Sequence, residues 1–184
     1  MKELFYDGII QGNGIADAIL HTHEPFIKDY LILHILLRKY NPKTVLEIGT
    51  HIGEGTQIIC NALPNAKVYS LDLPLNAAFK TLQHPKLKNM FVGQNCKLPY
   101  IQLFGDSMTF DHPLAEAWFI DGEHDYVHAR HETIEAIKQQ AKLIIWHDAD
   151  IPEVNNAITD SFLWNKDYEL FRVTDTRIAY ALHL

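Results

Sequence analysis

The stretch TVLEIGTHIGEGT, residues 44–56, joins a short apolar run to three closely spaced glycines. Its first five residues have the composition of a buried strand. Gly49, Gly53 and Gly55 follow, and glycines at such a junction permit a tight turn and a close backbone approach to a ligand. The first N–H groups of a helix behind the turn would face that ligand. The stretch therefore predicts a strand, a binding turn and a helix over residues 56–63, although a plain strand–helix turn has the same pattern.

The glycine spacing excludes two common phosphate-binding motifs. The dinucleotide fingerprint G-x-G-x-x-G is not present, because Thr50 and His51 follow Gly49, and the stretch contains no Gly-Lys-Ser/Thr of a P-loop. A nicotinamide oxidoreductase is therefore disfavoured. Glu47 is the unusual residue of the stretch, since an acid in a buried strand is costly unless it has a partner.

Further apolar runs alternate with helical patterns along the chain. Strands are expected over residues 67–72, 101–106, 117–121 and 142–148, helices over 127–141 and around 154–162, and a terminal hairpin over 168–173 and 177–182. Short, nearly continuous apolar strands separated by helices indicate a parallel sheet that is buried on both faces. We therefore predict a doubly wound α/β fold with a mostly parallel seven-stranded sheet and a C-terminal antiparallel hairpin.

The whole chain, residues 1–184, is expected to be one domain. Residues 1–24 contain several glycines and predict an N-terminal arm or lid, and residues 25–40 predict a leading helix before the core of residues 41–184. The leading helix is apolar on several sides, which suggests burial against the sheet and also against a partner subunit in a homodimer.

Two later helices carry more local signals. On the helix over 127–141, the buried side is expected to carry Val127, Ile134, Ile137 and Ala141. Asp150, with Glu153 three residues later, resembles the capping box that begins a helix.

The composition limits the class of protein. The chain has 184 residues, with 16 Lys and Arg against 23 Asp and Glu, and its net charge is −7. A nucleic-acid partner held by bulk charge is disfavoured, because phosphate binding needs a basic face. The most apolar stretch, residues 30–37, is much shorter than the ~20 residues of a membrane span, and the N-terminus carries acids where a signal peptide would be apolar. We therefore expect a cytoplasmic protein with neither a membrane nor a nucleic-acid partner.

Acidic residues follow four of the predicted strands, namely Asp72, Asp106, Asp121 and Asp148. Open α/β sheets bind ligands at the carboxyl ends of their strands. Asp72 could accept hydrogen bonds from both hydroxyls of a ribose, and Asp121 with Asp148 on the adjacent strand would suit a hard cation such as Mg²⁺. The structural alternatives are a turn for Asp72 and a helix cap for Asp106 and Ser107.

Histidines accompany the last two of these acids. His124 follows Asp121 by three residues, so both side chains could address one atom above the sheet. His147 directly precedes Asp148, where it could also simply cap the strand. With 11 histidines in the chain, most have no part in a site.

These motifs, in this order, resemble the class I S-adenosylmethionine-dependent methyltransferases over about residues 40–184. The segment DGEHDY, residues 121–126, and the pair His147-Asp148 are most similar to small-molecule O-methyltransferases of the macrocin O-methyltransferase type, which also resemble the cephalosporin hydroxylase group. The resemblance implies a Rossmann-like methyltransferase fold with S-adenosyl-L-methionine as cofactor. The implied cofactor-binding residues are Glu47, Gly49, Thr50, Gly53, Thr56, Asp72, Asp106, Ser107 and Asp121.

The same resemblance implies a chemistry. Asp121 and Asp148 would bind Mg²⁺ together with His147, which stands where the family often has Glu. His124 would be the catalytic base that deprotonates a hydroxyl, and a free imidazole, which titrates near ~6.5, suits that task. Ala149 departs from the Asn of catechol-type relatives.

Methyl transfer to an oxygen of a small molecule is therefore the main functional hypothesis. The second is an S-adenosylmethionine-binding module without transferase activity, because the short chain has no insertion that would cover a substrate. An NAD-dependent oxidoreductase is the third. In the main hypothesis, substrate selection is expected to come from the arm, the loops at the strand ends or a second subunit.

Overall fold

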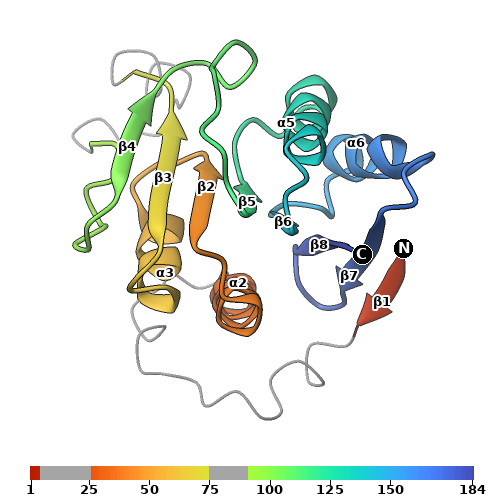
Figure 1. The fold of residues 1–184 in the computed structure, drawn as a ribbon, viewed down its shortest axis with the longest axis horizontal. Helices are drawn as coiled ribbons and strands as arrows, with labels where there is room; N and C mark the ends of the chain where they lie inside the picture. Colours follow the sequence, from red (N-terminus) through yellow and green to blue (C-terminus); the bar gives the residue numbers. More distant parts are fainter. Residues whose placement is uncertain (5–25, 75–90) are drawn as a thin grey trace.

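The computed structural model describes residues 1–4, 26–74 and 91–184 of the chain. These residues form one eight-stranded sheet in the order β1-β7-β8-β6-β5-β2-β3-β4 (Figure 1). Neighbouring strands are parallel except around β8, which is antiparallel to both β6 and β7. The predicted doubly wound, mostly parallel sheet with a C-terminal antiparallel hairpin is confirmed.

The strands are β1 (Lys2–Leu4), β2 (Thr44–Ile48), β3 (Lys67–Asp72), β4 (Ile101–Phe104), β5 (Ala117–Ile120), β6 (Leu143–Trp146), β7 (Tyr168–Val173) and β8 (Ala179–His183). The helices are α2 (Ile27–Tyr40), α3 (Glu54–Ala62), α5 (Tyr126–Lys138) and α6 (Pro152–Phe162). No helix of these described ranges is long and apolar enough to cross a membrane.

The sheet is buried on both faces. Helices α2 and α3 pack together on one side, and α5 and α6 pack together on the other (Figure 1). Side chains of β2 alternate between the two layers, so that Val45 joins the core under α2 and α3, whereas Leu46 and Ile48 join the core under α5 and α6. This double burial is the physical reason for the nearly continuous apolar runs in the sequence.

The strand order reverses between β2 and β5. From β2 the chain builds β3 and β4 on one side, and it then crosses to build β5 and β6 on the other. Beyond the last residue of β2, Gly49 N–H donates to the Leu71 carbonyl at 2.8 Å, and the Ile48 carbonyl accepts from Asp121 N–H at 2.9 Å. The end of β2 is thus tied to both neighbours at the point where open α/β sheets leave a crevice for a ligand.

The N-terminal part differs from the expectation. Residues Lys2–Leu4 pair in parallel with β7 and add an eighth strand where an irregular arm was predicted. Three residues are too few to show a strand period in a sequence, and the rest of the predicted arm lies outside the described residues. Helix α2 is buried from Asp29 to Leu37 within this one chain, so its apolar pattern needs no partner subunit. The homodimer remains a prediction.

Two local expectations for the later helices need correction. The buried stripe of α5 consists of Ala129, Glu132, Thr133 and Ala136. Of the side predicted from the sequence, Ala141 is buried and Ile137 packs against the same core, but Val127 is 59% exposed. Helix α6 begins at Pro152, so its N-cap is Ile151 without a side-chain bond, and Asp150 faces the guanidinium of Arg177 instead. A proline at the first helical position stabilises this start without a capping box.

The turn after β2 should tolerate no side chain at Gly49. Gly49 has a φ of +96°, and an added Cβ would lie 2.1 Å from the Asp121 carbonyl oxygen. We expect Gly49→Ala to lower the free energy of unfolding by about 3 kcal/mol or more in urea titrations, because left-handed strain alone costs ~1–3 kcal/mol and the clash with backbone adds to it.

Gly122→Ala is the matched control for this substitution. Gly122 lies on the neighbouring turn, and its added Cβ would meet only side-chain atoms, Ile48 at 3.2 Å and the Glu132 carboxyl at 3.5 and 3.9 Å. If both variants lost the same amount of stability, the close contact between Gly49 and Asp121 would not be the cause of the loss.

Candidate functional site

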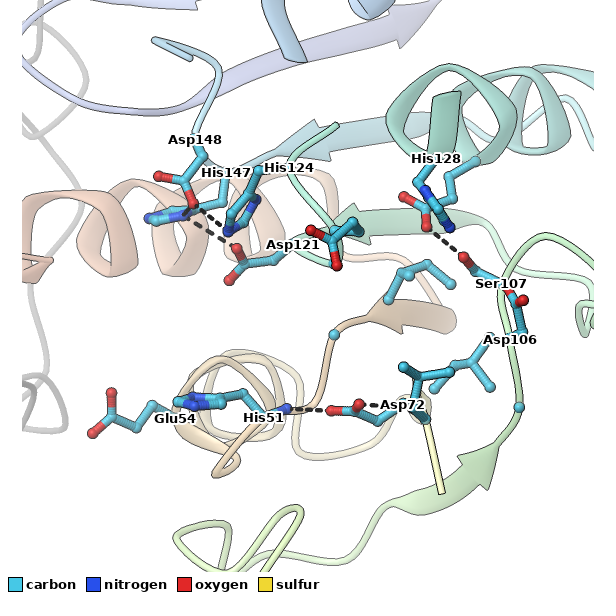
Figure 2. A pocket seen from close by; sticks show the side chains of 18 of the residues that line it. His51, Glu54, Asp72, Asp106, Ser107, Asp121, His124, His128, His147 and Asp148 are labelled. Carbon is cyan, nitrogen blue, oxygen red and sulfur yellow. Dashed lines mark hydrogen bonds and ion pairs between the residues drawn. The ribbon is translucent and has the colours of Figure 1, made fainter. Parts of the chain in front are cut away.

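A cavity of about 520 Å³ lies at the carboxyl ends of the parallel strands. Its volume falls within the ~300–1,000 Å³ that is typical of small-molecule sites. Figure 2 shows two groups of polar side chains at opposite ends, with His51, Glu54 and Asp72 along a further side of the cavity. Asp121, His124, His147 and Asp148 form one group, which we call the acid–imidazole cluster. Asp106, Ser107 and His128 lie at the opposite end.

Glu47 lies behind the cavity wall, on the side of β2 that faces α3. It is 1% exposed, and its Oε2 accepts hydrogen bonds from the hydroxyls of Thr56 and Ser70, both at 2.5 Å. The Ser70 hydroxyl in turn lies 2.6 Å from that of Thr50, which also accepts a bond from the Gln102 amide at 2.9 Å. Oε2 of the buried acid is therefore satisfied, and its hydrogen-bond network connects β2, β3, β4 and α3.

Burial dominates the titration of Glu47. It raises the pKa of this carboxyl from its ordinary value of 4.5 to about 8, although the bonds from Ser70 and Thr56 favour the charged form. Glu47 Oε1 has no hydrogen-bond partner among the described residues, and a Cβ on Gly55 would lie 2.6 Å from it. At neutral pH the carboxyl is therefore mostly protonated.

Asp72 is fixed at the cavity wall by the backbone. Its Oδ2 accepts from His51 N–H and its Oδ1 accepts from Leu73 N–H, both at 2.7 Å. Burial raises the pKa of Asp72, and these two bonds only partly oppose the rise. Each oxygen keeps a further lone pair, so the carboxylate can still accept hydrogen bonds from a ligand in the cavity.

Ser107 and Glu132 form the far end of the cavity. The Ser107 hydroxyl donates to Glu132 Oε1 at 2.6 Å, and this bond joins the loop after β4 to helix α5 (Figure 2). Asp106 begins the same loop and accepts a hydrogen bond from Met108 N–H at 2.9 Å through its Oδ1. Asp106 therefore also stabilises a local turn, whereas the helix cap of the structural alternative is not formed, because no helix directly follows among the described residues.

His147 is a buried imidazole between three carboxylates. Its Nδ1 lies 3.2 Å from Asp121 Oδ1 and 3.0 Å from Asp148 Oδ2, and its Nε2 lies 3.2 Å from Asp29 Oδ2. Burial opposes a charge on the ring, but the carboxylates, Asp121 above all, outweigh it and raise the pKa of His147 to about 12. The ring is therefore an imidazolium that holds the acids of two strand ends and of α2 together.

Asp148 is the most constrained acid of the cluster. Its backbone is left-handed, with a φ of 51°, a conformation that in a non-glycine residue stores strain and is concentrated at functional sites. Its Oδ1 lies 2.6 Å from Arg177 Nη1, and its Oδ2 lies 3.2 Å from His124 Nε2. Burial raises the pKa of Asp148, but the neighbouring cations, His147 first, lower it below the usual range.

The same cluster could hold a cation. One ligand atom each from Asp121, His124 and Asp148 lie within 4.8 Å of one another. Two carboxylates and an imidazole fit a divalent cation that accepts both nitrogen and oxygen donors. Among the described residues, His147 is not one of the three whose ligand atoms gather here, and its metal role stays a prediction.

Solved structures that align with this chain include methyltransferases. The methyltransferase PaMTH1 of Podospora anserina, bound to SAH, aligns with a TM-score of 0.59 at 12% identity, over 95% of this chain and 91% of that chain. An O-methyltransferase of Bacillus cereus in complex with SAH aligns with a TM-score of 0.58 at 15% identity, over 96% and 90%. This chain has the class I methyltransferase fold.

A third solved structure with the same fold is that of an enzyme involved in a biosynthesis. The O-methyltransferase TomG of Streptomyces achromogenes, involved in Tomaymycin synthesis and in complex with SAM, aligns with a TM-score of 0.56 at 17% identity, over 89% of this chain and 82% of that chain. No family model matches the sequence, and no curated protein matches it either.

Within the methyltransferase fold, the predicted cofactor residues divide into two groups. Those that line the cavity are Gly49, Asp72, Asp106, Ser107 and Asp121. Those that lie behind its wall are Glu47, Thr50, Gly53 and Thr56, whose packing shapes the turn after β2. The predicted base His124 also lines the cavity, together with the two acids assigned to the metal.

Several lining residues were not predicted from the sequence. Phe26 and Tyr30 come from the start of α2, and their ring centroids lie 5.5 Å and 6.3 Å from that of His147. Nothing in the sequence near α2 indicates that it reaches the strand ends. Glu132 did leave a signal, because it is an acid at helical spacing from Ala129 and Ala136 on the buried stripe of α5.

The raised pKa of Glu47 gives a stability prediction with a defined sign. The folded state binds this proton more tightly than the unfolded state, so the contribution of Glu47 to stability falls as the pH rises from 4.5 to about 8. Glu47→Gln removes the titration and keeps an oxygen acceptor for Ser70 and Thr56. We expect its stability relative to the unsubstituted chain to rise by about 3 kcal/mol between pH 5 and pH 8 in urea titrations, at ~1.4 kcal/mol per pKa unit.

Glu153→Gln, at an exposed position of α6, is the matched control and should show no such trend. A relative stability of Glu47→Gln that is flat across this pH range would mean that Glu47 is charged in the folded protein.

Proposed function

We propose that this chain is an S-adenosylmethionine-dependent methyltransferase that methylates an oxygen of a small molecule. The observation that carries the proposal is that one cavity contains both the ribose-type acid Asp72 and the acid–imidazole cluster. A donor bound along the strand ends and an acceptor bound at the cluster would therefore share one enclosed space. Holding two reactants in line can supply ~7–11 kcal/mol of the barrier in favourable cases.

The proposed cofactor position follows from the cavity wall. Gly49 lines the cavity, and the nearby Asp121 carbonyl requires that this residue has no side chain. Asp72 would accept hydrogen bonds from the ribose hydroxyls, and the loop of Asp106 and Ser107 would border the base. When bound, S-adenosylmethionine supplies a methyl group on a positively charged sulfur.

His124 is proposed as the general base. Its Nε2 lies 3.2 Å from Asp148 Oδ2, so Nε2–H can donate to that carboxylate while Nδ1 accepts the proton of a substrate hydroxyl. Asp148 would then orient the ring and stabilise its charge after the proton has moved. The side chain of His124 is 44% exposed, which leaves it accessible to an acceptor that enters from solvent.

The same side chains could instead bind a divalent cation. Asp121, His124 and Asp148 would hold it, and it would stabilise negative charge on the acceptor oxygen. His124 would then be a ligand through Nε2, and that nitrogen would no longer bond to Asp148. His147 and Arg177 already neutralise part of the cluster, so the chain also stabilises its acids without a metal.

The charge of the cavity favours a neutral or cationic acceptor. Its described lining includes seven acids and four histidines but no lysine or arginine. An acidic cavity of this kind attracts the positively charged sulfonium and repels phosphate groups. A nucleic-acid acceptor is disfavoured for the same reason, in agreement with the net charge of −7.

Calorimetric titration tests the cofactor assignment. We expect S-adenosylhomocysteine to bind and NAD not to bind, and we expect Asp72→Ala to weaken the affinity by about 10- to 100-fold, the range for losing hydrogen bonds to a charged group. Asp111→Ala, at an exposed acid outside the cavity, is the matched control and should bind as the unsubstituted chain does. Tight binding of NAD would overturn the proposal in favour of an oxidoreductase.

Turnover with a panel of small phenols and alcohols tests the base. In an assay of S-adenosylhomocysteine release, His124→Ala should lower kcat by about 10²- to 10⁴-fold, the usual contribution of a general base, with cofactor affinity changed by less than about twofold. His131→Ala, on α5 outside the cavity lining, is the control. Unchanged turnover would remove His124 from its role, and loss of a bound metal together with activity would assign it as a ligand. Cofactor binding without turnover of any acceptor would favour the non-catalytic binding module.

A further inference from the structure

Glu132 is a buried acid of the cavity for which the proposed reaction has no use. It lies on the buried stripe of α5 and is 1% exposed, yet it lines the cavity. Its Oε1 accepts from the Ser107 hydroxyl at 2.6 Å. Its Oε2 is equally buried and has no hydrogen-bond partner among the described residues.

The unpaired oxygen of Glu132 differs from that of Glu47 in its position. Buried polar atoms are nearly always hydrogen-bonded, and an unpaired one costs about 1–3 kcal/mol. Glu47 Oε1 is also unpaired, but Glu47 lies behind the cavity wall, whereas Glu132 lines the cavity. His128 lowers the pKa of Glu132 by its charge but forms no ion pair with it among the described residues, and its Nδ1 faces Asp125 Oδ2 at 2.8 Å. Burial outweighs this effect and raises the pKa of Glu132 to about 7. The unsatisfied oxygen at the cavity therefore indicates a donor that a ligand provides.

The position of Glu132 restricts what that donor can be. Ser107 and Asp106 lie at the end of the cavity opposite the acid–imidazole cluster (Figure 2). A Cβ on Gly122 would lie 3.9 Å from Glu132 Oε2, and Gly122 itself lines the cavity. The Glu132 carboxyl therefore lies directly beside a residue of the cavity wall.

We propose that Glu132 recognises the nucleobase of the ligand, with Oε2 accepting a hydrogen bond from the exocyclic amine of adenine. This inference rests on the proposed function, because it assumes that the ribose lies at Asp72. A 6-amino purine donates at this position, whereas a 6-oxo purine presents a second acceptor to an acid that is already desolvated. Glu132 is therefore a specificity-determining residue from a helix, distinct from the loop residues that border the base.

The test compares S-adenosylhomocysteine with S-inosylhomocysteine, its 6-oxo analogue, by calorimetric titration at about pH 8.5, where Glu132, with a pKa of about 7, is charged and acts only as an acceptor. We expect the unsubstituted chain to prefer the amino ligand by about 10- to 100-fold, since a site built to accept from a donor leaves its acceptor unpaired with the wrong ligand. In Glu132→Gln the side-chain amide can donate to a 6-oxo group, so the preference should shrink to about threefold or less, or reverse.

Two further variants keep the result interpretable. Glu135→Gln changes an acid one turn later on α5, outside the cavity lining and paired with Lys138, and should keep the full preference. Glu132→Asp keeps the charge but moves it away from the adenine. It replaces Glu132→Gln if that variant does not fold, and it should bind the amino ligand more weakly than the unsubstituted chain does.

An unchanged preference in a folded Glu132 variant would overturn the inference and leave Glu132 a structural partner of Ser107. So would equal binding of both ligands by the unsubstituted chain. If neither ligand bound, the proposed function itself would fail, and that outcome is distinguishable from the other two.

Discussion

The close contact between Gly49 and the Asp121 backbone is the constraint on which the site depends. At this point the strand order reverses, and the ends of β2 and β5 lie against each other with no room for a Cβ at Gly49. One consequence is that the backbone of the turn at Gly49 lines the cavity. The other is that Asp121, at the end of β5, is held beside the end of β6, where its Oδ1 lies 3.2 Å from His147 Nδ1. The positions of the turn after β2 and of the acid after β5 therefore both depend on this contact.

The buried charges of the molecule are handled in three different ways, and the differences separate structure from function. Glu47 is neutralised by protonation and hydroxyl bonds, which makes it a structural link behind the wall. His147 is charged and neutralises three acids from separate elements, which makes the cluster rigid. Glu132, like Glu47, has one satisfied and one unsatisfied oxygen, but it lines the cavity. At a cavity wall, a ligand can complete the hydrogen bonds of such a group.

Sequence reasoning was reliable where one local pattern has one physical cause. The runs of buried strand residues in β2, β3, β5 and β6 follow from burial on both faces, and the glycine turn follows from its backbone geometry. It failed where two patterns compete. On α5, Val127 and Ile137 suggested one buried face, but the helix buries Ala129 and Ala136 with Glu132 between them. Apolar residues on an exposed side are common, so hydrophobicity alone could not choose the face.

The sequence by itself determined the fold class, the order of the strands along the chain and the acids that end them. These depend on periodicity and turn chemistry, which act over a few residues. Only the tertiary structure decided which of those acids face the cavity, that His147 serves the protein as an internal cation, and that Phe26, Tyr30 and Glu132 join the site from two helices. The physical reason is that each of these outcomes depends on groups far apart in the chain, as between Asp29 and His147, and on the desolvation that their packing imposes.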